Sequence, residues 1–175
     1  QSIGEYLEYS FRTSASAGTL IHYSETHDNS RLAAQERGEV PPESPNLAWS
    51  RLRNRLCALT SIGGGFGFTN GVEWAATEQV NVHSARGMAW GSETNLVAEL
   101  SRLNHLLLDH PCFVDGARLI RLSPTGSPVY ALRRDSAEGL DSVLVLVNTE
   151  PGRSESIKLS PDVWAAFGGG RLDLL

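Results

Sequence analysis

The stretch Thr19–Arg31, TLIHYSETHDNSR, decides the fold prediction. Its first five residues, Thr19–Tyr23, are typical of a short strand, and the polar cluster Ser24–Arg31 follows at once. In (β/α) architectures, reacting groups collect just past the carboxyl ends of parallel strands, because each strand holds the next loop rigid. The stretch therefore predicts a parallel strand that presents polar side chains to an open cleft.

Five residues of this cluster are the candidate site residues: Glu25, His27, Asp28, Asn29 and Arg31. A carboxylate beside a histidine and an arginine is kept ionised by nearby donors and positive charge. An ionised Asp28 suits stabilisation of a cationic, oxocarbenium-like transition state. A structural interpretation stays open, because Asp-Asn-Ser also forms turns and helix N-caps and His27 could simply fasten the loop.

Two helices and a second strand are predicted in the rest of the first half. Leucines and other apolar residues recur at helical spacing in Leu47–Ile62 and again in Leu96–Leu107. We expect Gly63–Gly65 to end the first helix and Phe66–Val72 to form the strand. The order strand, helix, strand, helix indicates βα units with parallel strands.

The second strand leads into Glu73 and Trp74, on the same expected rim as Asp28. A tryptophan face can stack on a pyranose ring, and a glutamate can accept hydrogen bonds from its hydroxyls. The structural alternative is that Glu73 binds loop amides and Trp74 packs under the following segment. Trp90 has the same two interpretations.

The second half is predicted to be antiparallel. Arg118–Leu122, Val129–Arg134 and Ser142–Asn148 are strand-like runs separated by turn signals. Arg133 and Arg134 alternate across a strand, and we expect both to be solvated.

Composition and net charge argue against some classes of function. The chain has 175 residues, 41% of them hydrophobic, and a formal net charge of -5, which gives no reason to expect nucleic acid or an anionic membrane as partner. No apolar run approaches the roughly 20 residues that span a bilayer, and no secretion signal is visible at the start. Cys57 and Cys112 are expected to be buried, reduced thiols, which suits a cytoplasmic location.

Four motifs in this order resemble the α-amylase superfamily, glycoside hydrolase family 13. YSETHDNSRLA, from Tyr23, is similar to the family's fourth conserved region, which closes the seventh barrel strand. GFGFTNGVEW, from Gly65, resembles the eighth strand, and VAELSRLNHLLLDHPCF, from Val97, the last barrel helix. VYALRRD followed by SVLVLVNTE looks like the opening of the β-sandwich C-terminal domain. The resemblance implies that Asp28 is the transition-state stabiliser and that His27 contacts substrate.

The expected fold is therefore α/β: residues 1–111 form the C-terminal remnant of a (β/α)8 TIM barrel, strands seven and eight with their helices. Residues 112–175 then form a partial antiparallel β-sandwich. The implied parent is a retaining hydrolase or glucanotransferase that acts on α-glucan or maltooligosaccharide and needs neither cofactor nor metal. In the family, the nucleophile and the acid/base come from the fourth and fifth strands. We therefore expect this chain to be an inactive fragment whose partner is the N-terminal part of the same enzyme.

Three alternatives remain open at this point. A carbohydrate-binding or structural module would use the aromatic residues Trp74 and Trp90 without chemistry of its own. A small independent hydrolase would use Glu25 or Glu73 as its acid, within reach of Asp28. A metal site at His22, Glu25, His27 and Asp28 is disfavoured, because strand alternation sends its members to opposite faces.

Overall fold

The computed structural model describes residues 3–18, 20–23, 25–34, 65–84, 87, 90–93, 95–114, 116–150, 152–167 and 172–174. The helix expected at Leu47–Ile62, with Cys57 inside it, lies outside the described residues, as do Gly63 and Gly64. The elements in chain order are α1 (Ile3–Ala17), β1 (Ile21–Tyr23), β2 (Gly65–Gly67), α4 (Val97–Asp109), the 3-10 helix η1 (Pro111–Phe113), β3 (Arg118–Arg121), β4 (Val129–Asp135), β5 (Ser142–Asn148) and α5 (Pro161–Ala165).

β1 and β2 form a parallel pair, as the βα pattern predicts. Tyr23 lies opposite Gly67, and a Cβ atom at Gly67 would be 2.9 Å from the Tyr23 ring. The glycine therefore lets this ring approach the neighbouring strand. The prediction of a strand as far as Val72 was wrong, because residues 70–74 leave the sheet and form turns.

The first hydrophobic core lies between α4 and the segments that follow β1 and β2. Leu100 and Leu103 of α4 are buried, one turn apart on the same face, as the leucine spacing predicts. They cluster with residues that follow β1 and β2, namely Leu32, Val72 and Leu96. α4 therefore packs against the segments that follow β1 and β2, which carry the candidate site residues.

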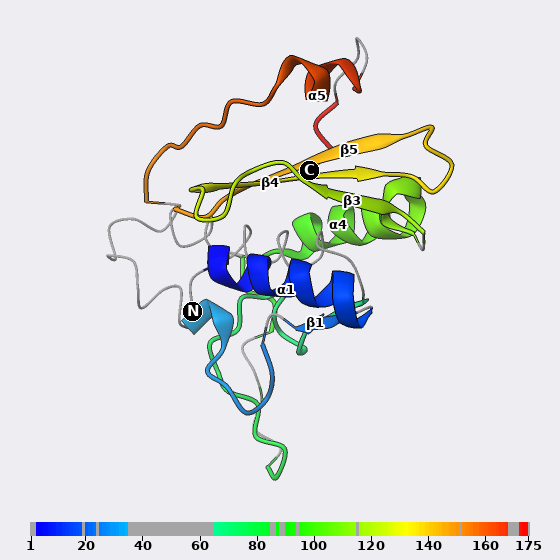
Figure 1. Cartoon of the computed structure of the whole chain (residues 1–175). Helices are drawn as coiled ribbons and strands as arrows, with labels where there is room; N and C mark the ends of the chain where they lie inside the picture. The colour runs from blue at the N-terminus through cyan, green and yellow to red at the C-terminus, as the bar shows by residue number, and fades with distance from the viewer. Residues whose placement is uncertain are drawn as a thin grey trace.

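β3, β4 and β5 form one antiparallel sheet with β4 in the centre. Six of the seven residues of β4 are buried, which requires cover on both faces of the sheet. α1 lies against one face and α5 on the other side (Figure 1). Among the described residues the sheet has no second sheet opposite it, so the partial β-sandwich stays a prediction.

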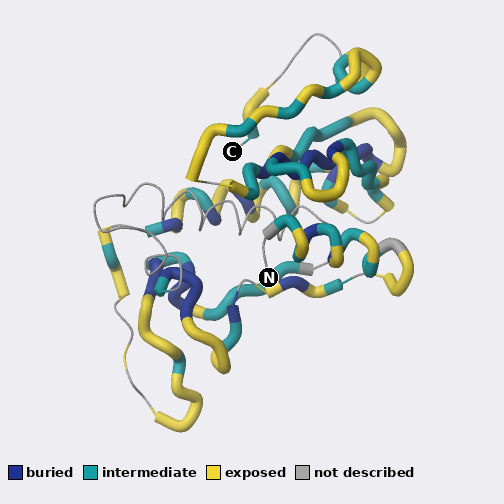
Figure 2. The backbone as a smooth tube through the Cα atoms, turned by 60° about the vertical axis from the view of Figure 1, so that its left-hand side comes forward, coloured by how far each residue is buried: buried dark blue, intermediate teal, exposed yellow. Residues whose placement is uncertain are grey.

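α1 was missed in the sequence, although its pattern is amphipathic. One face of the helix carries Tyr6, Leu7, Ser10 and Phe11 at helical spacing. Leu7 is fully buried in a second core with β4 and β5. Buried segments accordingly occur both around the loops after β1 and β2 and in the sheet (Figure 2), where they belong to two separate hydrophobic clusters.

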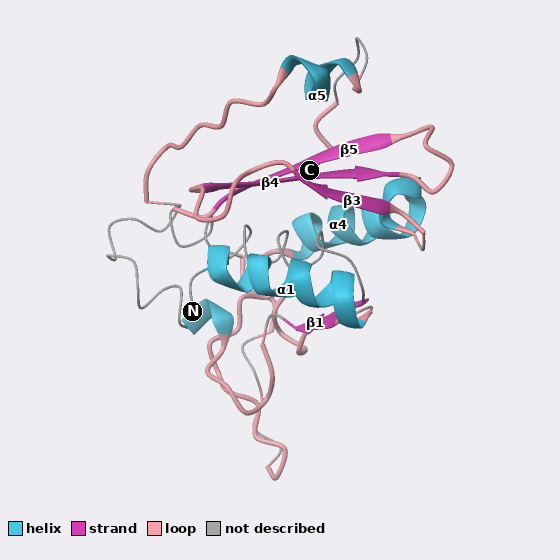
Figure 3. Ribbon diagram, in the orientation of Figure 1, coloured by secondary structure: helices cyan, strands magenta, loops and turns pink. Residues whose placement is uncertain are grey.

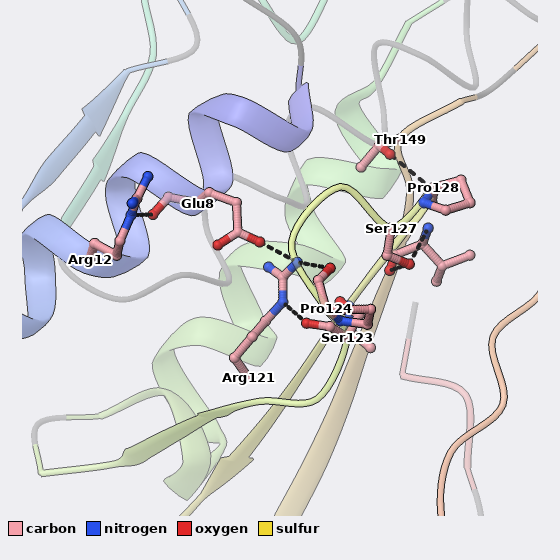
Figure 4. Close-up of polar contacts among 10 residues, drawn as sticks. Glu8, Arg12, Arg121, Ser123, Pro124, Ser127, Pro128 and Thr149 are labelled. Atoms are coloured by element: carbon pink, nitrogen blue, oxygen red, sulfur yellow. Dashed lines mark hydrogen bonds and ion pairs between the residues drawn. The ribbon is translucent and has the colours of Figure 1, made fainter.

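A charged contact fastens α1 to the sheet (Figure 4). Glu8 Oε1 on α1 lies 2.5 Å from Arg121 Nη2 on β3. Arg121 also donates from Nε to the Ser123 carbonyl at 2.8 Å, and its guanidinium stacks 3.6 Å from the centre of the Tyr130 ring. α1 belongs to the first predicted unit and packs on the second, so the two units share a core.

The Tyr130→Phe variant is expected to lose less stability than the original protein when the pH is raised from neutral to alkaline. Burial raises the pKa of Tyr130 from its ordinary 10.0 to about 12, against the opposing effect of Arg121. Between these values the folded protein keeps a proton that the unfolded chain loses, so stability falls as pH rises through this window. The Tyr130 hydroxyl has no hydrogen-bond partner among the described residues, so Tyr130→Phe should be nearly neutral at pH 7. Urea denaturation at about pH 7 and about pH 11 measures the free energy of unfolding of each protein and its fall between the two pH values.

The exposed Tyr9 supplies the control for this experiment. Tyr9→Phe should leave the alkaline fall as it is in the original protein. An equally steep fall in the Tyr130→Phe variant would contradict the assignment.

Arg134 corrects one prediction and Cys112 confirms another. Arg134 is 3% exposed and not solvated: its Nε donates to the Cys112 carbonyl at 2.7 Å, and its guanidinium lies over the Phe113 ring. Burial lowers the pKa of Arg134 to about 10, with the proximity of Cys112 acting the other way. Cys112 is a free, fully buried cysteine, as expected. Arg133 remains partly exposed and pairs with Asp135.

None of the helices in the described ranges combines the length and apolarity that crossing a bilayer requires.

Candidate functional site

The two loops that leave β1 and β2 lie on the same side of the molecule (Figure 3). This follows from the parallel pairing, which brings the carboxyl ends of both strands to one edge. Side chains of the described residues join the loops by hydrogen bonds: Thr69 Oγ1 donates to the Glu25 carbonyl at 3.2 Å, Arg31 Nη2 to the Asn70 carbonyl at 2.9 Å, and Gln79 Nε2 to the His27 carbonyl at 3.2 Å. The loops therefore form one surface.

His27 and Asp28 lie at the exposed tip of the first loop. Their side chains are 51% and 80% exposed, and His27 Nε2 is 3.3 Å from Asp28 Oδ1. Asn29 turns back on the loop and donates from Nδ2 to Thr26 Oγ1 at 2.7 Å. The turn that the Asp-Asn-Ser sequence favours is thus present, and it presents an imidazole and a carboxylate to solvent.

Glu25 and Arg31 close the base of this turn as a buried ion pair. Glu25 Oε1 is 2.7 Å from Arg31 Nε, and the two side chains are 3% and 1% exposed. Glu25 Oε2 accepts from the Leu32 amide at 2.5 Å. Burial raises the pKa of the Glu25 carboxyl, and this effect outweighs the Leu32 amide and the Arg31 charge, which lower it. Both candidates therefore hold the loop and do not face solvent.

Glu73 supports the second loop through backbone contacts. Its Oε2 accepts from the Gly71 amide at 2.9 Å, and its carbonyl accepts from the Leu96 amide at 2.7 Å. Gly71 has a φ of 96°, which a residue with a side chain rarely adopts. Glu73 thus stabilises a tight turn and links it to the start of α4.

Trp74 lines an open hollow of about 540 Å³ between the second loop and α4. The lining residues are Phe68, Glu73, Trp74, Val97, Leu100, Ser101, Asn104, His105 and Leu108. Most of the hollow's wall is apolar, with a few polar groups on α4, as is common for binding sites of small molecules. Trp90, the other aromatic candidate, is 55% exposed.

The seven candidate residues fall into two groups. Glu25, His27, Asp28, Asn29 and Arg31 lie together in the first loop. Within the described residues, no hydrogen bond or ion pair joins Glu73 or Trp74 to His27 or Asp28. The first loop instead meets the second at Thr69, Asn70 and Gln79.

These three contact residues were missed in the sequence. The signal for Thr69 and Asn70 was available, because polar residues follow the apolar GFGF run directly. Nothing in the sequence marks Gln79. Among the described residues, no group of three or more His, Cys, Asp and Glu side chains is arranged to hold a metal ion. His22 is 3% exposed, and its Nδ1 lies 2.9 Å from the Tyr6 hydroxyl of α1.

Neither a protein-family model nor a curated protein sequence matches this chain.

Proposed function

We propose that this chain is the C-terminal part of a retaining α-glucan-active glycoside hydrolase or glucanotransferase, with a (β/α) barrel remnant related to the α-amylase superfamily. The observation that supports the proposal best is the tip of the first loop. His27 and Asp28 stay open to solvent at the carboxyl end of a parallel strand, while the loop beneath them is fixed. That combination suits a site that must recognise a sugar in one orientation.

In this proposal Asp28 acts by charge. Its exposed carboxylate would stabilise the positive charge that develops at the anomeric carbon. His27, 3.3 Å away, donates to sugar hydroxyls and restrains the carboxylate. Asn29 remains a candidate for sugar contact at the same tip.

The proposal assigns neither the nucleophile nor the acid/base to this chain. The Glu25 carboxylate is enclosed by Arg31 and the Leu32 amide, and Glu73 is engaged by the Gly71 amide. A retaining enzyme needs two carboxyl groups about 5 Å apart across the scissile bond. The N-terminal part of the same enzyme would supply them, so we expect this chain alone to bind sugar without cleaving it. A cytoplasmic location is part of the proposal, and the buried, unpaired thiol of Cys112 is compatible with it.

A second candidate function is a carbohydrate-binding module without chemistry. The hollow beside Trp74 favours it, because an indole ring and an apolar wall can cover the C–H face of a pyranose. In that case the binding energy would come from Trp74 and not from the tip of the first loop.

The proposal predicts that the chain binds maltoheptaose and that His27→Ala weakens this binding about fivefold. The loss corresponds to one hydrogen bond of about 1 kcal/mol. Asp28→Asn should keep most of the affinity, because the proposed role of the carboxylate is in the transition state. Isothermal titration calorimetry measures the affinities, and chromatography of the sugar after incubation measures cleavage.

Trp74→Ala separates the two functions. If Trp74→Ala abolishes binding while His27→Ala has no effect, the chain is a carbohydrate-binding module that binds at the hollow, and the proposal of a sugar site at His27 and Asp28 is wrong. If the original chain releases product and Asp28→Asn does not, the complete machinery lies within these residues and our fragment prediction is wrong.

A further inference from the structure

The Arg31 guanidinium contacts the bases of both loops at once. Its Nε meets Glu25 Oε1 at 2.7 Å, and its Nη2 donates to the Asn70 carbonyl at 2.9 Å. The first contact closes the turn that carries His27 and Asp28. The second reaches the segment that follows β2. A planar guanidinium therefore spans both loops from a position that is 1% exposed.

Glu25 is held from three directions. Besides Arg31, its Oε2 accepts from the Leu32 amide, where the chain enters a helical turn, and its carbonyl accepts from Thr69 Oγ1. Both ends of the turn are thus fixed, while His27 and Asp28 stay exposed between them. Neither Glu25 nor Arg31 has a surface that a sugar could reach.

We propose that Arg31, acting with Glu25, is a positioning residue that sets the orientation of the His27 imidazole and the Asp28 carboxylate relative to the loop after β2. This inference rests on the proposed function, since it names the device that prepares that site. A buried ion pair adds little net stability, because both ions lose their hydration. Its value here is geometric: the forked guanidinium allows one arrangement of the two loops, and a displaced loop tip would misplace the His27 and Asp28 side chains.

The test is Arg31→Lys. Lysine keeps the positive charge beside Glu25, so the chain should fold, but one ammonium cannot satisfy both Glu25 Oε1 and the Asn70 carbonyl. We expect maltoheptaose affinity to fall by up to about fivefold, the loss expected for His27→Ala, because a displaced loop tip misplaces the His27 imidazole. Amide hydrogen exchange in residues 26–30 should become faster by a similar factor. Arg121→Lys is the matched control, because Arg121 also joins a carboxylate to carbonyl oxygens, at the α1–sheet contact. It should change neither quantity.

Thr69→Val supplies a second variant that keeps the buried charges and removes only the hydroxyl that donates to the Glu25 carbonyl. It should shift both quantities in the same direction as Arg31→Lys, by a smaller factor. If both variants bind maltoheptaose like the original chain and exchange at 26–30 is unchanged, the inference fails and the proposed function stands.

If the original chain binds no maltoheptaose, the proposed function fails and exchange alone decides the inference. Faster exchange at 26–30 in Arg31→Lys, with no change in Arg121→Lys, would still support a positioning role. Equal exchange in all variants would overturn it.

Discussion

Replacing Leu7 with alanine is expected to lower the free energy of unfolding by about 2–5 kcal/mol. Leu7 has no exposed surface and packs with Tyr130, Leu132 and Val147 of the sheet. Its removal leaves a cavity between α1 and the sheet, which the surrounding side chains fill only partly. Urea denaturation followed by circular dichroism gives the free energy directly.

Tyr9 offers a control on the same helix, because its side chain is 59% exposed. Tyr9→Ala changes helix propensity by a few tenths of a kcal/mol and should remove little packing. Equal losses for the two variants would mean that the effect comes from helix formation and that α1 does not share the core of the sheet.

The second large effect is expected at the buried ion pair. Arg31→Met should lower stability at neutral pH by about 3–5 kcal/mol, because it leaves the Glu25 carboxylate buried without its partner. Adding Glu25→Leu to this variant should restore part of the loss, since the uncompensated charge is then gone. Denaturation of the two single variants and the double variant forms a cycle that isolates the pair.

The pH dependence of Arg31→Met gives an independent check. Burial already raises the pKa of Glu25, and loss of Arg31 should raise it further. A carboxyl group whose pKa is higher in the folded state gains relative stability as pH falls through that value. The gap between the variant and the original protein should therefore narrow on acidification. A gap that is independent of pH would show that the loss comes from packing alone.

The spacing of the apolar residues predicted a helix or strand correctly where the residues that it marks as apolar are also the ones that the fold buries. The leucines of α4 and the apolar run of β4 lie where the pattern requires, because α4 buries one face and β4 buries both. The apolar run of β5 forms the expected strand but is mostly half-buried, since β5 lies at an edge of the described sheet. The end of β2 was predicted too late in the chain: the polar residues Thr69 and Asn70 already follow the apolar run, and Gly71 adopts a left-handed conformation within the turns after the strand. α1 was missed because four of its fifteen residues are serine or threonine, which local propensity associates with turns.

The sequence predicted which loop carries the candidate residues, but not which of them are buried and which are exposed. Strand followed by a polar cluster indicated the loop of His27 and Asp28, and that loop does follow a parallel strand. Which polar residues are buried depends on partners distant in sequence, such as Asn70 for Arg31, and no local pattern encodes them. Arg134 is the same case, since it is buried by the turn after α4. The catalytic role of Asp28 stays a prediction.

The place of α1 also sets the order in which the chain can fold. Its Leu7 face is covered by β4 and β5, which come late in the sequence. During synthesis from the N-terminus, α1 must wait until the sheet has been made, with its apolar side unprotected in the meantime. Contacts this far apart in sequence close large loops and slow the search for the native state. Refolding should therefore be limited by the docking of α1 onto the sheet, a step that β1 and α4 can precede.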